Sequence, residues 1–188
     1  MTVQLHLFTR ASPFLDDAVR IFVRTWPGYD PVSARASFLR GAGRRDFRGL
    51  VAVSDGVVVG FGFGARSSPG IWWHDQMTNQ LGREHPALRD AWQLTELAVV
   101  EEYRGRGIGG RLHDALLAAQ PCPRALLSTY ATNARARAFY ERRGWYSIHS
   151  AFTFPRDAHA YVAIAKELVG SSPATQRRSS APAEGRAC

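Results

Sequence analysis

Cysteine, lysine and long apolar runs are scarce in this 188-residue chain. The two cysteines, Cys122 and Cys188, are too few for a disulfide framework, which argues against a disulfide-stabilised secreted domain. No apolar run of about 18 residues occurs, so we expect no membrane-spanning helix. The N-terminal segment also lacks the basic start, apolar stretch and small-residue cleavage site of a signal peptide. These absences predict a cytoplasmic protein with no membrane partner.

Composition and charge predict one folded domain. Apolar residues make up 45% of the chain, and we place the domain at residues 1–169. Residues 170–188 are rich in Ser, Ala and Pro and are predicted to form a disordered tail. The net charge of +8 suits a polyanionic cofactor and would also suit RNA. No RNA-binding motif occurs, and the arginine-rich, alanine-rich bias can arise from codon composition, so we expect no nucleic-acid partner.

Periodicity and turn signals predict alternating strands and helices. We expect strands at Val3–Phe8, Phe47–Val53, Val57–Phe63, Leu94–Val100, Arg124–Ser128, Tyr146–Phe152 and Tyr161–Ala165. Helices are expected at residues 13–25 after Ser12-Pro13, at Val32–Leu39, from Ile108, and from the cap Asn133 to the stop at Gly144. Asp55-Gly56 is a strong hairpin signal. Gly60, Gly62 and Gly64 share one strand face, which favours close packing of a helix over contact with a bulky ligand.

The most informative stretch is a strand followed by an arginine-glycine loop and a helix. The apolar run Leu94–Val100 leads to the loop Arg104–Gly110, and Ile108, Leu112 and Leu116 follow at helical spacing. Free N–H groups and the helix dipole make a helix N-terminus an anion site, and glycines let a phosphate approach closely. This order of elements predicts an ordered pyrophosphate site, in preference to a disordered patch that binds nucleic acid.

Two common phosphate motifs do not fit this loop. A P-loop requires a lysine directly after its glycines, and the single lysine of the chain is Lys166. A dinucleotide fingerprint could be forced onto Gly105, Gly107 and Gly110. It would need an acidic residue about 20 residues later, where the chain instead has the apolar strand Arg124–Ser128.

Two sequence blocks together resemble the GNAT superfamily of N-acetyltransferases. The first is Arg104-x-x-Gly107-x-Gly109, shortly after the strand Leu97-Ala98-Val99. The second begins at Asn133 and includes Phe139-Tyr140 and Gly144-Trp145. The resemblance covers roughly residues 3–167 and implies an α/β (α+β) fold with a mixed, mostly antiparallel twisted sheet flanked by helices. Its two central parallel strands, here Leu94–Val100 and Arg124–Ser128, would splay apart and hold acetyl-CoA between them.

The resemblance also implies how acetyl-CoA, the acetyl donor, would be held. Backbone groups of Leu97, Ala98 and Val99 would bond the pantetheine arm, and Asn133, Phe139 and Tyr140 would contact it from the later helix. The residues of the pyrophosphate loop would be Arg104, Gly105, Arg106, Gly107, Ile108, Gly109 and Gly110. No metal is expected.

The catalytic residues are less clearly marked. Tyr140 lies two helical turns after Asn133, so both should face the cofactor, and its phenol could protonate a leaving thiolate; the other interpretation is a tyrosine that only packs. Members of the family often have a glutamate where this chain has Gln93. Gln93 is a candidate catalytic residue, since its amide cannot accept a proton but can orient a water or an amine. Glu96 is a second candidate, although its odd offset predicts the face opposite Gln93. His113 is expected at the surface.

Residues 66–91 form the least regular segment and are predicted to be a long loop. It carries Trp72, Trp73, His74 and Asp75, which could form a wall of the substrate pocket or a hydrophobic plug over the sheet edge. His74 and Asp75 are further candidates for a base.

The expected function is therefore an acetyl-CoA-dependent N-acetyltransferase (an acyltransferase of the EC 2.3.1 class) that acetylates a primary amine by direct attack. The acceptor is a small-molecule or peptide amine that the sequence does not identify. The alternative is a non-catalytic acyl-CoA-binding or sensing domain, which the glutamine at position 93 favours. A nucleic-acid-directed acetyltransferase would rest on charge alone. Members of the family often form dimers, and a homodimer is compatible with the resemblance.

Overall fold

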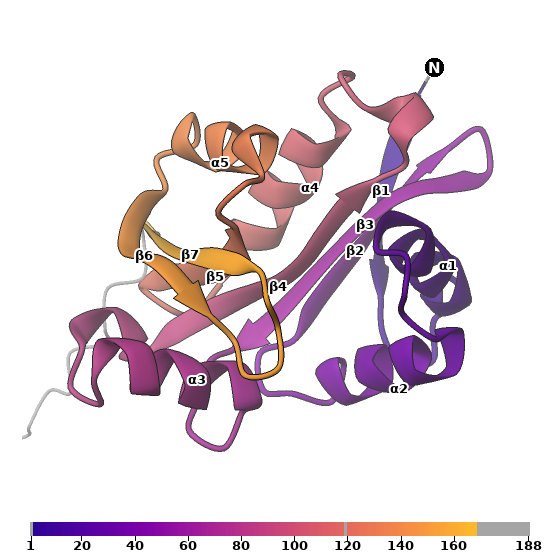
Figure 1. The fold of residues 1–188 in the computed structure, drawn as a ribbon. Coiled ribbons are helices and arrows are strands. Elements are labelled where there is room, and N and C mark those ends of the chain that lie inside the picture. The colour runs from indigo at the N-terminus through magenta and orange to yellow at the C-terminus, as the bar shows by residue number, and fades with distance from the viewer. Residues whose placement is uncertain (1, 119, 169–188) are drawn as a thin grey trace, which may run out of the picture.

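The computed structural model describes residues 2–118 and 120–168, so the predicted tail lies outside the described residues. Within this part, one mixed sheet has the strand order β1-β2-β3-β4-β5-β7-β6, and the single parallel pair is β4 with β5 (Figure 1). The strands are β1 (Val3–Phe8), β2 (Arg48–Ser54), β3 (Val57–Arg66), β4 (Ala91–Val99), β5 (Arg124–Tyr130), β6 (Tyr146–Thr153) and β7 (Ala160–Glu167). The mixed sheet predicted from the sequence is confirmed.

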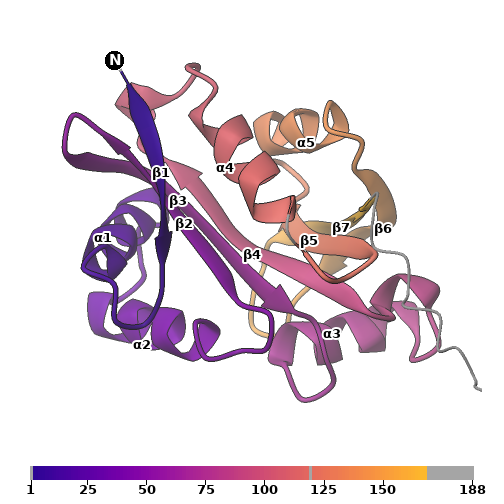
Figure 2. The same ribbon diagram turned by 180° about the vertical axis from the view of Figure 1, so that it is seen from behind.

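Helices cover both faces of this sheet. The helices are α1 (Leu15–Thr25), α2 (Pro31–Gly41), α3 (Trp72–Leu81), α4 (Ile108–Leu117) and α5 (Ala134–Glu141), with short 3-10 turns η1 (Pro86–Leu88) and η2 (Glu101–Tyr103). Figures 1 and 2 show α1 and α2 on one face and α4 and α5 on the other. None of the helices within residues 2–118 and 120–168 is both long and apolar enough to cross a membrane.

Three groups of buried side chains form the core. The first joins α4 and α5 to the sheet, with Leu112 and Leu116 among its fully buried members. The second joins α1 and α2 to the opposite face around Phe38 and Phe61. The third packs α3 against β5, β6 and β7. Ala98 of β4 belongs to the second group and Ala91 to the third. These two side chains lie on the same face of β4 because the strand has one extra residue, a bulge, between them. Helices α1, α2 and α3 therefore cover one face of the sheet, which we call the α1–α3 face.

The structure differs from the sequence prediction at the start of α1 and throughout α3. Helix α1 begins at Leu15 rather than at residue 13, because Ser12 Oγ accepts a hydrogen bond from Phe14 N and starts a turn before the helix. The prediction of a long loop over residues 66–91 is wrong, since Trp72–Leu81 form α3. The apolar side chains of α3 do not recur at regular helical spacing in the sequence. Trp73 and Met77 are buried because α3 packs against the sheet at β5–β7.

The glycines of β3 sit under α4, as the sequence pattern predicted. A Cβ on Gly60 would come within 3.3 Å of Leu112 Cδ1, and one on Gly62 within 2.8 Å of Leu116 Cδ1. The absence of side chains there lets α4 approach the sheet closely. The Asp55-Gly56 hairpin is also confirmed, because both residues have positive φ, 49° and 81°.

Gly64 is the tightest of these positions, and we expect Gly64→Ala to destabilise the protein by about 1–3 kcal/mol or more. Its Cβ would lie 2.2 Å from the backbone oxygen of Gln93 and 2.5 Å from the buried ring of Trp92, so β3 and β4 would have to separate. Gly109→Ala is the matched control, because the nearest atom to its Cβ is at 3.7 Å. Urea denaturation midpoints measure both; equal midpoints for the two variants would contradict this packing.

Candidate active site

The parallel strands β4 and β5 pair over three residues only and then separate. Ala91, Trp92 and Gln93 lie opposite Arg124, Ala125 and Leu126, and no further pair joins these two strands. Beyond this point β4 stays paired with β3 as far as Val99, while β5 stays paired with β7 as far as Tyr130. The predicted splay is therefore present, and we call the unpaired region between the facing edges of β4 and β5 the gap.

Backbone groups of β4 point into this gap at alternate residues. Val100 N donates to Val59 O at 2.9 Å, so Val100 and Ala98 direct their N–H and C=O groups toward β3. Leu97 and Val99 consequently direct theirs toward β5. The prediction that three successive residues offer free groups is wrong for Ala98, because an antiparallel strand alternates its hydrogen-bonding sides. At Val99 the carbonyl oxygen accepts from Arg104 Nε at 3.0 Å.

The arginine-glycine loop opens α4 at the same end of the gap. Gly105 and Gly107 have φ of 76° and 77°, a conformation that favours glycine, and a Cβ on either would meet no atom within 4 Å. Gly107 is the N-cap of α4 and no side chain caps the helix there. The first-turn N–H groups, including those of Ile108, Gly109 and Gly110, therefore have no intrahelical acceptor, as an anion site requires.

The arginines of the loop are held by the protein. Arg104 bonds Val99, as described above, and Arg106 donates to Glu102 O at 3.1 Å with its guanidinium over the ring of Tyr103. Both side chains are nevertheless exposed, so they lie where they could turn toward a phosphate. The backbone, rather than these side chains, forms the preformed part of the site.

Helix α5 borders the gap on the α4 side of the sheet. Asn133 caps it, since Oδ1 accepts from Ala136 N at 3.0 Å, which leaves the amide N–H groups of Asn133 as donors. The ring of Phe139 lies 3.8 Å from the position of a Cβ on Gly109, so α5 reaches the start of α4. The Arg143 guanidinium stacks on Phe139 at 4.0 Å from the ring centre. This contact fixes the position of the Phe139 ring beside the gap.

Tyr140 is buried on the same side, with 8% of its surface exposed. Its ring packs at 5.4 Å from that of Trp145 and at 5.1 Å from that of Phe139. Burial, together with the nearby charge of Glu96, raises the pKa of the Tyr140 hydroxyl above its ordinary value. The phenol therefore stays protonated at neutral pH and is available as a proton donor.

Glu96 lies on the same face of β4 as Gln93, and the predicted opposite placement is wrong. Phe63 pairs with Glu96 and Gly64 with Leu94, so Thr95 is an extra residue that forms a bulge. Because of this extra residue, the side chains of Gln93 and Glu96 lie on the same face of β4 although they are three residues apart. Both point to the α1–α3 face. Burial raises the pKa of Glu96 from 4.5 to about 8. A carboxylate with that pKa is a competent base near neutral pH.

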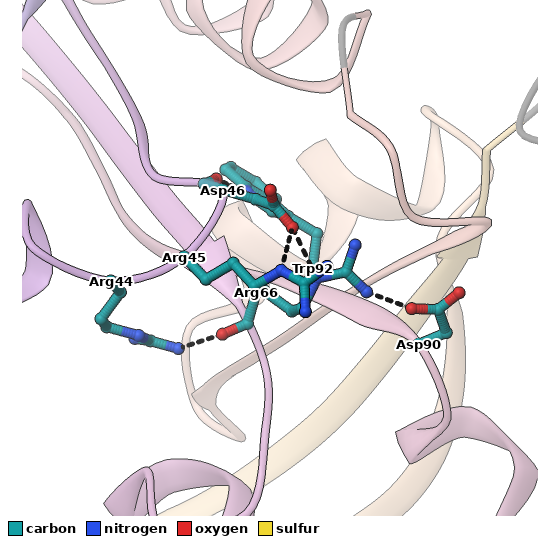
Figure 3. Close-up of polar contacts among 6 residues, drawn as sticks. All are labelled: Arg44, Arg45, Asp46, Arg66, Asp90 and Trp92. Atoms are coloured by element: carbon teal, nitrogen blue, oxygen red, sulfur yellow. Dashed lines mark hydrogen bonds and ion pairs between the residues drawn. The ribbon is translucent and has the colours of Figure 1, made fainter.

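Gln93 is held in place by an arginine. Arg44 donates from one nitrogen to the Gln93 side-chain oxygen at 3.1 Å and to Arg66 O at 2.9 Å. Figure 3 shows the surrounding network, in which the guanidinium of Arg66 bridges Asp46 and Asp90. These contacts anchor the part of β4 that pairs with β5. Glu96 is the acidic residue of β4 on the other side of the bulge, beside the gap. Gln93 is thus buried and held by Arg44 at the last paired residue of β4 and β5.

The raised pKa of Glu96 predicts how Glu96→Gln changes stability with pH. A carboxyl whose pKa is raised on folding contributes stability below the unfolded-state pKa, and this contribution is lost as pH rises toward 8. We expect the melting temperature of Glu96→Gln minus that of the wild type to be near zero at about pH 4 and to rise until about pH 8.5. Thermal unfolding across this range measures the difference; a difference independent of pH would refute the raised pKa.

His113 is buried, so the prediction of a surface position is wrong. Only 1% of its surface is exposed, because α4 turns it toward α5. Trp145 Nε1 donates to His113 Nε2 at 2.9 Å, and His113 Nδ1 lies 2.6 Å from an Asp114 oxygen. Burial lowers the pKa of His113, so the ring is neutral and joins α4 to the end of α5.

The four residues predicted at the acceptor site lie on α3 and differ in environment. Trp73 is buried and donates from Nε1 to Ser128 Oγ of β5 at 2.9 Å, and His74 is buried with Nδ1 2.9 Å from Ser67 Oγ. Trp72 is 56% exposed and packs on Phe154, while Asp75 accepts from Gly70 N. Trp73 and His74 thus have the packing role of the plug interpretation, beside the α1–α3 face of the gap. Burial lowers the pKa of His74.

Comparison with known proteins identifies the family. A model of the acetyltransferase (GNAT) family matches residues 15–145. The chain belongs to the GNAT family. A GCN5-like protein acetyltransferase of Mycobacterium tuberculosis is 32% identical over 126 residues, which are 62% of this chain and 61% of that protein. This GNAT chain thus spans less than two thirds of that relative.

Solved structures share the fold of this GNAT chain at low sequence identity. Ard1 from Thermoplasma volcanium superposes with a TM-score of 0.68 and 19% identity, over 90% of this chain and 99% of that one. An aminoglycoside 6′-N-acetyltransferase complexed with coenzyme A gives a TM-score of 0.66 and 18% identity, over 88% and 97%. These likenesses show the fold, and the predicted GNAT architecture is confirmed.

The residues around the gap fit coenzyme A. The open left-handed glycines and the uncapped start of α4 suit a pyrophosphate, and the free edge of β4 suits an amide-bearing arm. The bulge residue Thr95 has a buried hydroxyl without a hydrogen-bond partner among the described residues, at the level where β4 and β5 part. A buried polar atom without a partner is costly, and a ligand group or a water molecule beside Thr95 would satisfy it.

Proposed function

We propose that this protein is an acetyl-CoA-dependent N-acetyltransferase that acts on a primary amine. The observation that carries the proposal is the β4–β5 gap, which opens directly beside the glycine loop and the uncapped start of α4. A pyrophosphate at the loop and an arm along β4 would bring the thioester to the point where Glu96 and Tyr140 approach from opposite faces. The coenzyme A complex of the structurally similar aminoglycoside 6′-N-acetyltransferase supports this choice of cofactor.

Leu97 and Val99 would hold the arm of acetyl-CoA along the free edge of β4. Their N–H groups and the Leu97 C=O face β5 and find no strand partner there, so an amide-bearing chain can bond them as a neighbouring strand would; the Val99 C=O already accepts from Arg104. The amide N–H groups of Asn133 can add a bond from α5. The first-turn N–H groups of α4 would take the two phosphates.

Glu96 and Tyr140 divide the proton transfers between the two faces of the sheet. Acetyl-CoA supplies an acetyl thioester, whose C–S bond breaks as the C–N bond to the acceptor amine forms. On the α1–α3 face, the Glu96 carboxylate would take the proton that the attacking amine loses. On the α4 side, the Tyr140 hydroxyl would give its proton to the departing sulfur and regain one from solvent. A backbone N–H of β4 would polarise the thioester carbonyl.

The alternative of a non-catalytic acyl-CoA sensor loses its main support. It rested on glutamine at position 93, whereas the bulge brings Glu96 to the same face with a pKa suited to a base. The acceptor stays open between a small-molecule and a peptide amine. The name of the Mycobacterium tuberculosis relative favours a protein acceptor, and that of the structural relative favours a small molecule.

An acetyl-transfer assay tests the proposal. The protein is mixed with acetyl-CoA and a panel of amines (lysine-containing peptides, peptides with free N-termini, diamines and aminoglycosides), and release of the coenzyme A thiol is followed. We expect amine-dependent thiol release and an acetylated product by mass spectrometry. Tight binding of acetyl-CoA with no turnover of any amine would favour the sensor instead.

A further inference from the structure

A cluster of aromatic rings and one carboxylate lies where β5 separates from β4. Tyr130 ends β5, and its ring lies 4.9 Å from that of Tyr161 and 5.0 Å from that of His159. Asp157, in the turn between β6 and β7, accepts from the Tyr161 hydroxyl at 2.6 Å and from His159 N at 2.9 Å. We call these four residues the Tyr–Asp cluster. The sequence alone does not reveal this cluster, because its members come from separate strands and a turn.

The cluster faces the same side of the sheet as Glu96. Ser128, two residues before Tyr130, bonds Trp73 of α3, so alternation along β5 directs Tyr130 to the α1–α3 face. Tyr161 lies opposite Tyr130 in the β5–β7 register. Tyr29, in the connection between α1 and α2, is 54% exposed. Burial and the charges of Glu96 and Asp157 raise the pKa of Tyr29, which places it within electrostatic reach of both carboxyl groups.

Asp157 is a fixed negative charge without an arginine or lysine partner among the described residues. Within that part of the chain, the contact of its carboxylate with a basic side chain is with the ring of His159, whose Nδ1 lies 2.7 Å from Asp157 Oδ1. The hydroxyl of Tyr161 and the groups of His159 lower the pKa of Asp157 to about 2, so it stays ionised. Elsewhere in this arginine-rich chain, acidic residues such as Asp16, Glu84 and Glu167 pair with arginine. Glu96 likewise forms no ion pair within residues 2–118 and 120–168.

We propose that the Tyr–Asp cluster binds a second cationic group of the acceptor, distinct from the amine that is acetylated. The acceptor class is therefore a dication, in which a primary amine and another positive charge are joined by an aliphatic spacer. The faces of Tyr130 and Tyr161 attract a cation, and the Asp157 carboxylate adds a charge-assisted contact. This inference rests on the proposed function, because it takes Glu96 as the group that faces the reacting amine.

Binding of matched amines to the protein saturated with coenzyme A tests this inference. Cadaverine, pentylamine and aminovalerate have similar chains and end in a cation, a methyl group and a carboxylate, respectively. We expect isothermal titration to show cadaverine binding about tenfold or more tightly than the other two, the factor expected of one charge-assisted contact. Asp157→Asn should remove this preference, Tyr161→Phe should reduce it, and the surface variant Glu84→Gln should retain it.

The outcomes separate this inference from the proposed function. Equal affinities for cadaverine and pentylamine, or a preference that survives in Asp157→Asn, would overturn the dication proposal. If the protein acetylates pentylamine as efficiently as cadaverine, the proposed function stands and the cluster has no role in selectivity. If no amine is acetylated but the Asp157-dependent preference is present, the binding inference stands and the transferase activity is refuted.

Discussion

Tyr140→Phe is expected to lower kcat for acetyl transfer by about 10²–10⁴-fold, the usual contribution of a positioned general acid, with little change in acetyl-CoA affinity. The substitution removes only the hydroxyl, so the ring contacts with Trp145 and Phe139 remain. The raised pKa of Tyr140 keeps the wild-type phenol protonated. In the variant, which lacks the hydroxyl, the thiolate would have to depart unprotonated or take a proton from water. Steady-state kinetics and titration of acetyl-CoA measure the two quantities.

Tyr146→Phe is the matched control for this prediction. Tyr146 is an exposed residue of β6, an edge strand of the sheet, and its hydroxyl donates to Glu167 of β7. We expect its removal to leave kcat unchanged. If Tyr140→Phe retained wild-type kcat with a cognate amine, Tyr140 would be a packing residue, and the proton donor would have to be sought elsewhere.

Gly107→Glu is expected to weaken acetyl-CoA binding by at least about 100-fold. Two effects add: the residue would be strained at φ 77°, and its carboxylate would stand at the start of α4 where the pyrophosphate is expected. The negative charge of the glutamate would also repel the pyrophosphate and offset the attraction between the pyrophosphate and the helix dipole. Isothermal titration with acetyl-CoA gives the dissociation constant directly.

Two control variants divide the effect of Gly107→Glu into strain and charge. Gly107→Ala introduces the strain without the charge and should weaken binding much less. Gly70→Glu places the same substitution at another left-handed glycine, φ 84°, in the connection before α3. It should lower stability but leave the affinity for acetyl-CoA unchanged. Equal losses in Gly107→Ala and Gly107→Glu would mean that no anion is bound at this helix start.

Much of the fold could be predicted because local signals agree with its global arrangement. The Asp55-Gly56 hairpin, the Asn133 cap and the Gly144 stop each need a particular residue at a particular backbone conformation, and such requirements are visible in sequence. The glycine stripe of β3 indicated helix packing for the same reason. Helix α3 was missed because its order depends on contacts with β5–β7, which are distant in the chain.

The sequence marks the residues of the proposed cofactor site more clearly than those of the proposed acceptor site. The loop around Gly107 is one continuous segment of the chain, and so is the block from Asn133 to Tyr140. The residue spacing within each segment therefore indicates its role. The face of β4 on which Glu96 lies depends on the bulge at Thr95. No local sequence signal indicates this bulge, so simple alternation predicts the wrong face. Asp157 and Tyr130 meet only because β5 pairs with β7, a contact that sequence alone does not reveal.

The central claim is that acetyl-CoA binds in the gap between β4 and β5, and thermal unfolding with and without acetyl-CoA tests it most directly. At about 100 times its dissociation constant, a ligand adds roughly 2.7 kcal/mol to the stability of the folded state, which is a shift of several degrees for a domain of this size. We predict such a rise for the wild type and none for Gly107→Glu. No rise for the wild type at millimolar acetyl-CoA would contradict the account, and the loop would then be a site for another anion.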